Sequence, residues 1–228
     1  MNTSTLKLST IIFMSCIQCI FISKVSFGSP NKSIYIHGGI NEVCTQGNTF
    51  YVSSFLGINI SEDAGLTWRN VNTTDGLAND HVSRIYAKGD SVYAVTNAGL
   101  SVSRDRGKTW MNYSTTNGLH SDRITDIAVN EPSVYLATDK GITFTNDNGL
   151  TWKYSTTEND LGNNYVESVF VYGSKVYAAT ALGVSVSEDN CQSWINYSLD
   201  HTAKDIFVDA DTVYVATEAG PYVSSDSC

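Results

Sequence analysis

The chain has 228 residues, enough for one sizeable β domain, and 42% of them are hydrophobic. It carries 14 Lys and Arg against 23 Asp and Glu, which gives a formal net charge of −9. Such an acidic chain disfavours nucleic-acid binding, which depends on Lys and Arg neutralising phosphates, and docking on an anionic membrane surface.

The first 28 residues have the features of an export signal. Lys7 precedes an apolar run from about residue 11 to residue 22, and residues 26–28 place small side chains at the two cleavage positions. The apolar run is short for a membrane span and contains polar residues. We therefore expect a secreted or periplasmic protein without a membrane span, with a lipid anchor at Cys16 as the alternative. Removal of the signal and its two lysines changes the net charge to −11.

A 42-residue repeat organises the single domain expected over residues 29–228. The phrase Ser61-Glu62-Asp63-Ala64-Gly65-Leu66-Thr67-Trp68 returns at 103–110, at 145–152 and, altered, at 187–194. All four Trp of the chain therefore stand 42 residues apart. A fixed period of about 40 to 50 residues is typical of propeller blades or solenoid units.

Each repeat unit predicts four short antiparallel strands. In the second unit these are residues 82–87, the β-branched and aromatic run 91–96, the alternating segment 100–103, and residues 110–113 after the repeated phrase. Three hairpins join the four strands into one blade. The five units span residues 40–71, 82–113, 124–154, 166–197 and 203–228, and the fifth stops before its fourth strand.

The predicted fold is therefore all-β, a five-bladed β-propeller of four-stranded antiparallel blades, with no helix. An unpaired strand edge is a liability that ring closure removes. We expect the exported N-terminal segment around residues 33–36 to supply the missing outer strand of the fifth blade and so to close the ring.

The repeated phrase suits a tight turn. The Asp carboxylate can accept hydrogen bonds from the backbone of its own hairpin, Gly permits a positive φ, and Trp fills the space between blades. The fourth copy departs from this pattern with Cys191 in place of Gly and Ser193 in place of Thr. Identical copies spread around a ring cannot converge on one ligand, so we interpret these residues as structural: Asp63, Trp68, Asp105, Trp110, Asp147, Trp152, Asp189 and Trp194.

These turns resemble those of the Asp-box, or BNR-repeat, β-propellers, and the resemblance covers all five units. It implies the propeller fold. Relatives of this kind occur in sialidases and other glycosidases, in sorting receptors, in photosystem assembly factors and in bacterial surface or sensor proteins. A likeness of fold does not choose among these activities.

Two sets of residues are candidates for a binding site, because they vary between otherwise equivalent units. The first set lies in the loops between blades, where amide, carboxylate, imidazole, guanidinium and phenol groups suit a sugar or a peptide: Asp80, His81, Asp122, Arg123, Asn164, Tyr165 and His201. The second set lies at one position of the inner strands, facing the axial channel: Glu42, Arg84, Asp126 and Asp205, with Ser168 in the fourth unit. Ion pairing explains the second set, and a calcium ion held by its carboxylates is the alternative.

Catalytic patterns are weak in this sequence. A sialidase needs a cluster of three Arg, and only Arg84 and Arg123 are expected near the axis. Another glycosidase needs two carboxylates at a set separation, for which Asp80 and Asp122 are the candidates. The sequence has no phosphate-binding Gly loop, nucleophile elbow or metal-ligand motif. We therefore expect neither an enzyme nor a bound cofactor or metal.

The sequence favours an exported, monomeric binding module that uses one propeller face for protein interaction or assembly. The alternative is a lectin-like carbohydrate-binding propeller, and the second alternative is a glycoside hydrolase. Variation among the inter-blade loops favours a protein partner, whereas Tyr113, Tyr154 and Tyr197, which we place at equivalent positions, favour the lectin. The three cysteines of the mature chain, Cys44, Cys191 and Cys228, allow either one disulfide with a free thiol or three free thiols.

Overall fold

The computed structural model describes residues 39–210 and 212–225. These residues form five antiparallel sheets, four of four strands and the last of three, each with its strands in chain order. Two single-turn 3-10 helices, η1 (Thr73–Asp75) and η2 (Thr157–Asn159), lie between sheets. The strands are β1 (Ile40–Gln46), β2 (Thr49–Ser54), β3 (Gly57–Ser61), β4 (Arg69–Val71), β5 (Val82–Lys88), β6 (Ser91–Thr96), β7 (Gly99–Ser103), β8 (Met111–Tyr113), β9 (Ile124–Asn130), β10 (Ser133–Thr138), β11 (Gly141–Thr145), β12 (Lys153–Ser155), β13 (Val166–Tyr172), β14 (Lys175–Thr180), β15 (Gly183–Ser187), β16 (Ile195–Ser198), β17 (Ala203–Asp209), β18 (Thr212–Thr217) and β19 (Gly220–Ser224).

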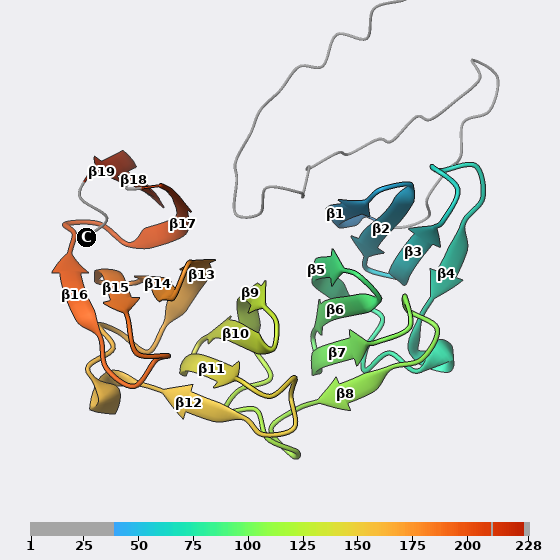
Figure 1. Cartoon of the computed structure of the whole chain (residues 1–228), viewed down its shortest axis with the longest axis horizontal. Coiled ribbons are helices and arrows are strands. Elements are labelled where there is room, and N and C mark those ends of the chain that lie inside the picture. Colours follow the sequence, from blue (N-terminus) through green and yellow to red (C-terminus); the bar gives the residue numbers. More distant parts are fainter. Residues whose placement is uncertain (1–38, 211, 226–228) are drawn as a thin grey trace, which may run out of the picture.

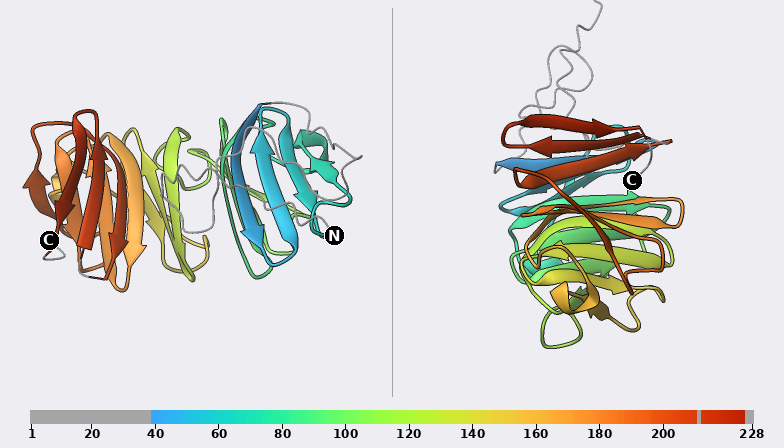
Figure 2. Two further views of the ribbon diagram at one scale, coloured as in Figure 1. Left: turned by 90° about the horizontal axis from the view of Figure 1, so that it is seen from above. Right: turned by 90° about the vertical axis from the view of Figure 1, so that its left-hand side faces the viewer.

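The sheets stand side by side in an arc, with β1, β5, β9, β13 and β17 on its inner side (Figure 1). Their strands run between two opposite faces of the molecule (Figure 2). The all-β class and the five predicted units are thus confirmed. Closure of the ring is not seen among the described residues, and the predicted closing strand at 33–36 lies outside them, as do the export signal and Cys228.

Hydrophobic clusters join each sheet to the next. One buried cluster lies between the first and second sheets, and three more connect the sheets in sequence up to the fifth. Trp110, Trp152 and Trp194 each pack against one of these clusters, as expected for side chains that fill the space between blades. Cys44 and Cys191 are buried free thiols in two different clusters.

The repeated phrase forms the predicted turn in all four copies, which we call the Asp turns (61–68, 103–110, 145–152 and 187–194). In the third copy the Asp147 carboxylate accepts hydrogen bonds from the Thr151 amide at 2.9 Å, the Thr151 hydroxyl at 2.6 Å and the Thr145 hydroxyl at 2.6 Å. These bonds favour the charged carboxylate and lower the pKa of Asp147 to about 2. Ser193 replaces Thr in the fourth copy and donates the same bond to Asp189 at 2.6 Å.

Strand register corrects one prediction about the repeat. Tyr113 pairs with Leu100 and Tyr197 with Val184, but the residue that pairs with the equivalent Ile142 is Ser155. Tyr154 is therefore not equivalent to Tyr113 and Tyr197, and that prediction was wrong. Because neighbouring residues of a strand face opposite sides of a sheet, the offset of one residue leaves the Tyr154 side chain 56% exposed.

Candidate functional site

One face of the molecule collects the segments in which the repeats differ. At this end of each sheet, the segment that leads into an inner strand lies beside the turn between the second and third strands. Backbone bonds connect the two, for example from the Gly57 amide to the Asp80 carbonyl at 2.7 Å and from the Asn97 amide to the His81 carbonyl at 3.3 Å. We call this surface the loop face. It comprises residues 77–81, 119–123, 161–165 and 199–202 and the turns at 55–56, 97–98, 139–140, 181–182 and 218–219.

Three of the predicted loop residues hold their own loops together. Oδ1 of Asp80, of Asp122 and of Asn164 accepts the backbone amide seven residues earlier, at 2.8, 2.6 and 2.8 Å. The amide of Asn164 serves as well as the two carboxylates, so the position requires a hydrogen-bond acceptor and not an acid. The structure therefore assigns all three a structural role that the sequence analysis had not considered.

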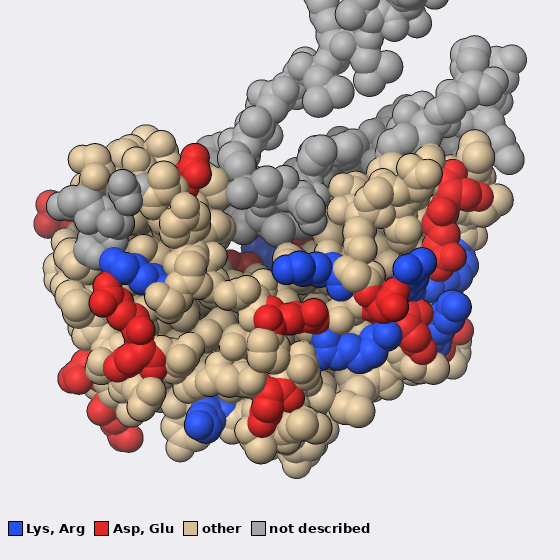
Figure 3. Space-filling view, viewed as in Figure 1, with Lys and Arg blue, Asp and Glu red and all other residues tan. Residues whose placement is uncertain are grey.

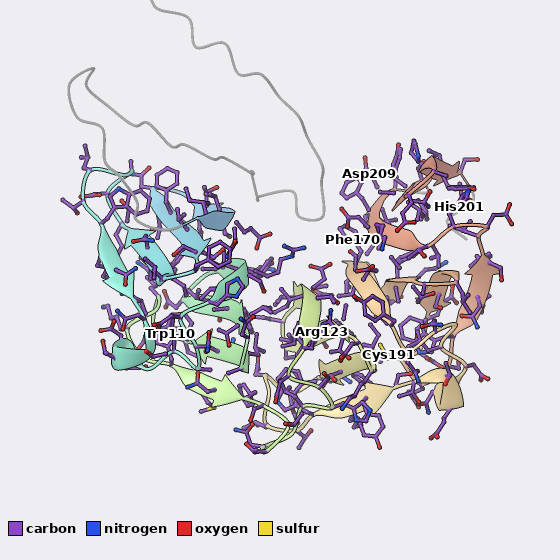
Figure 4. The ribbon with its side chains drawn as sticks, turned by 180° about the vertical axis from the view of Figure 1, so that it is seen from behind. Trp110, Arg123, Phe170, Cys191, His201 and Asp209 are labelled. Carbon is purple, nitrogen blue, oxygen red and sulfur yellow. The ribbon has the colours of Figure 1, made fainter. Side chains whose placement is uncertain are left out.

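His81 and Arg123 each contact an aromatic ring on the loop face. The His81 ring lies 4.5 Å from that of Phe55, centroid to centroid, and its Nδ1 is 2.7 Å from the Asn97 side-chain nitrogen. The Arg123 guanidinium lies over the Tyr165 ring at 6.0 Å. Arg123 points towards the middle of the arc, whereas His201 lies on the outer side of the fifth sheet, so the predicted loop residues do not form one cluster (Figure 4).

Large apolar side chains are exposed on the same face. Phe55 and Leu56 form the turn of the first sheet, and Leu182 lies in the corresponding turn of the fourth. Each exposes more than half of its surface, 52% for Phe55 and Leu56 and 58% for Leu182. These residues could not be predicted from the sequence, because an isolated apolar residue in a turn carries no periodic signal.

The predicted axial residues form a chain of contacts between neighbouring sheets. Oε2 of Glu42 accepts the Ile85 amide at 2.6 Å, and Nε of Arg84 lies 3.8 Å from Oδ1 of Asp126. Oδ2 of Asp126 accepts the Val169 amide at 3.1 Å. Arg84 and Asp126 thus form an ion pair between adjacent inner strands, whereas Glu42 Oε2 binds a backbone amide of the neighbouring inner strand.

Ser168 lies between two axial carboxyl groups. Its hydroxyl is 2.7 Å from Oδ2 of Asp126 and 2.9 Å from Oδ1 of Asp205. A hydroxyl has one proton, so both contacts are hydrogen bonds only when one carboxyl is protonated. Burial raises the pKa of Asp205 to about 6, with a smaller contribution from Asp126, and burial also raises the pKa of Asp126. Burial thus favours one shared proton on the pair of Asp126 and Asp205.

A pocket of about 420 Å³ opens at the third sheet, and most of its lining residues were not predicted from the sequence. His120 and Tyr154 stack there with ring centroids 4.1 Å apart and planes 13° apart. Asn164 is the only predicted site residue among those that line it. Tyr154 could have indicated this site, because it stands where the other units have Asn at 70, 112 and 196. The sequence alignment that made Tyr154 equivalent to Tyr113 and Tyr197 hid this difference.

Within the described residues, no group of three or more His, Cys, Asp or Glu side chains is placed to hold a metal ion. No helix in the same part of the chain is long and apolar enough to span a membrane. Acidic and basic side chains are interspersed on the face drawn in Figure 3, without one large basic patch.

No protein-family model and no curated protein matches the chain. Several solved structures are similar to it. YCF48 bound to a D1 peptide is 17% identical with a TM-score of 0.65, over 86% of this chain and 67% of that one. The extracellular domain of a putative one-component system from B. thetaiotaomicron is 14% identical with a TM-score of 0.65, over 80% of this chain and 26% of that one. An ancestral GH74 enzyme is 17% identical with a TM-score of 0.61, over 79% and 27%. The chain thus spans only about a quarter of the last two, and at these identities the matches show a β-propeller fold and no activity.

Proposed function

We propose that this chain is an exported, non-enzymatic binding module whose loop face engages another protein. The observation that carries the proposal is the set of exposed apolar side chains Phe55, Leu56 and Leu182, which lie on the same face as the Arg123–Tyr165 pair. Aromatic side chains and Arg are enriched in protein–protein interfaces, whose fully buried centre is more apolar than the rest of the surface.

The similar structures support this choice in part. YCF48, which matches over most of this chain, has been solved bound to a peptide, and the matching sensor proteins contribute extracellular domains. A module that presents a loop face outside the cytoplasm agrees with both observations and with the predicted export signal.

A glycoside hydrolase fits the loop face less well. The candidate carboxylates Asp80 and Asp122 accept backbone bonds inside their own loops, and Asn164 does the same at the third equivalent position. A catalytic acid and its base or nucleophile must present their carboxyl oxygens to the substrate, whereas Oδ1 of both candidates already accepts a backbone amide. Asp80→Asn and Asp122→Asn would abolish turnover if the second alternative were correct, so assays of the parent protein on a broad glycoside panel test it directly.

Substitution of the apolar anchors tests the protein-binding proposal. We expect Leu56→Asp and Leu182→Asp each to weaken binding to a partner captured from the protein's own envelope extract by at least about tenfold, because a charge would replace a buried apolar contact. The measurement is surface plasmon resonance with the identified partner.

Leu150→Asp is the matched control. Leu150 is 86% exposed and lies in an Asp turn, away from the loop face, so the same change of charge there should leave the affinity unchanged. Equal weakening by all three variants, or none by the two loop-face variants, would contradict the proposal.

A further inference from the structure

Sheets two and four share a polar network that joins their outer strand to the loop face. In the second sheet the Ser101 hydroxyl donates to Oδ1 of Asn112 at 2.7 Å and accepts the Ala78 amide at 3.0 Å. The side-chain amide of Asn112 then donates to the Gly76 carbonyl at 3.0 Å. The fourth sheet repeats all three bonds through the equivalent residues, Ser185, Asn196, Gly162 and Asp160.

The third sheet replaces every side chain of this network. Thr143 stands in place of Ser, Tyr154 in place of Asn and His120 in place of Ala or Gly. Thr143 Oγ1 is buried and has no hydrogen-bond partner among the described residues. An unsatisfied buried hydroxyl destabilises a fold. The substitutions therefore make the third sheet less stable than it would be with the hydrogen bonds of sheets two and four.

The same substitutions build an aromatic platform over a pocket. His120 stacks on Tyr154 almost face to face, and Tyr154 remains more than half exposed. The pocket of about 420 Å³ lies within the range of about 300 to 1,000 Å³ usual for small-molecule sites. Residues around the platform are polar: Asp139, Lys140, Thr156, Thr157, Glu158 and Asn164.

The charges around the platform indicate the class of ligand. Asp139 and Glu158 accept hydrogen bonds, and Lys140 and the side-chain amide of Asn164 donate them. The two carboxylates would repel an anion, and Lys140 would repel a cation. A neutral molecule with many hydroxyl groups both donates and accepts, and the apolar face of a sugar ring can lie against an aromatic ring.

We propose that the pocket of the third sheet binds a neutral saccharide, with Tyr154 and His120 as its platform. This site adjoins the protein-binding part of the loop face but uses different residues, so it goes beyond the function proposed above. Sheets two and four have no such site, because the polar network occupies the equivalent places there.

The test of the saccharide site replaces its residues with those at the equivalent positions of the second sheet. The triple variant His120→Ala, Thr143→Ser and Tyr154→Asn installs the network of the second sheet in the third. We expect this variant to fold and to melt at the same temperature as the parent or higher, since the network gains hydrogen bonds. The probes are neutral mono- and disaccharides of glucose, galactose, mannose and N-acetylglucosamine, measured by saturation-transfer NMR with the whole purified protein.

The proposal predicts saturation transfer to at least one of these sugars with the parent protein and at least a tenfold weaker association with the triple variant and with Tyr154→Asn alone. Leu182→Asp should bind the sugar normally, which separates this site from the protein-binding face. Binding that survives Tyr154→Asn, the absence of binding to every sugar, or preferential binding of Lys- or Arg-containing tetrapeptides in a parallel titration would each overturn the proposal.

Discussion

At the residue scale, the fourth Asp turn shows how a departure from the repeat is accommodated. Cys191 adopts a φ of 63°, in the left-handed region where the other copies have Gly. A Cβ at the equivalent Gly149 would lie 2.8 Å from the Tyr113 hydroxyl. The residue equivalent to Tyr113 in the next sheet is Ser155, which is smaller and accepts the Trp194 indole N–H at 2.8 Å. The small Ser155 therefore leaves room for the Cys191 thiol.

This pairing predicts energetic coupling between residues 155 and 191. Ser155→Tyr alone should destabilise the protein by about 1 to 3 kcal/mol, because the larger ring would overpack the space that Cys191 fills. In a Cys191→Gly background the same substitution should cost less, with a coupling energy of about 0.5 to 3 kcal/mol. Urea denaturation of the parent, both single variants and the double variant measures this cycle. Additive effects would contradict the steric explanation.

At the element scale, every inner strand has a bulge next to its axial residue. The pairing with the second strand shifts between Ile40 and Glu42 in the first sheet and in the same way in the other four. Bulges redirect side chains and increase the local twist. Two bulged residues also join neighbouring sheets: the side-chain amide of Asn41 donates to the Val82 carbonyl at 2.8 Å, and the Thr125 hydroxyl donates to the Val166 carbonyl at 2.6 Å.

The half-buried carboxyl of Asp205 in the fifth inner strand predicts a pH dependence of stability. Asp205 has a pKa of about 6 in the folded protein and about 3.9 when unfolded, so its contribution to stability is present below pH 4 and is lost as the pH rises to 6. The Asp turns act in the opposite sense and at lower pH, since their lowered pKa values give stability above pH 4 that is lost towards pH 2.

Asp205→Asn should therefore flatten the dependence of unfolding free energy on pH between 4 and 6, and it should stabilise the protein at pH 7 by roughly 1 to 3 kcal/mol. Chemical denaturation across this range measures the effect. Asp209→Asn on the same strand is the control, because Asp209 is exposed and should leave the curve unchanged. A curve for Asp205→Asn parallel to that of the parent would contradict the raised pKa of Asp205.

At the scale of the whole molecule, the fifth sheet has an uncovered face. Tyr51, Tyr93, Tyr135 and Tyr177 occupy equivalent positions in the first four sheets and are at most 3% exposed, because the next sheet covers each of them. Tyr214 is the fifth and is 44% exposed. The described residues thus leave open the side of the fifth sheet that a closed ring would cover.

Ring closure by the segment before residue 39 stays a prediction. If residues 33–36 supply the outer strand of the fifth sheet, deletion of residues 29–38 should expose the edge of β19, lower the melting temperature and cause dimerisation or aggregation. Light scattering coupled to size-exclusion chromatography, with thermal unfolding, measures both effects. A deletion variant that stays monomeric and equally stable would refute closure by this segment.

The sequence by itself determined the period, the number of units and most strand positions. The second strand of the second unit, 91–96, agrees with β6, and the predicted hydrogen bonds of the Asp turns are present. These features depend on local chemistry: β-branched runs, a carboxylate near its own amides and Gly where φ is positive. Because each local pattern occurs four or five times, the copies together identify the strands and turns more clearly than any single copy does.

Tertiary structure alone decided which side chains meet. The bulges, the role of Asp80, Asp122 and Asn164 in their loops, and the one-residue register that exposes Tyr154 all depend on how strands pair and how sheets stand beside one another. Stacking of His120 on Tyr154 joins the loop before β9 to the outer strand β12 of the same sheet. Such contacts carry no local signal, since each partner is chosen by packing across the fold and not by its neighbours in the chain.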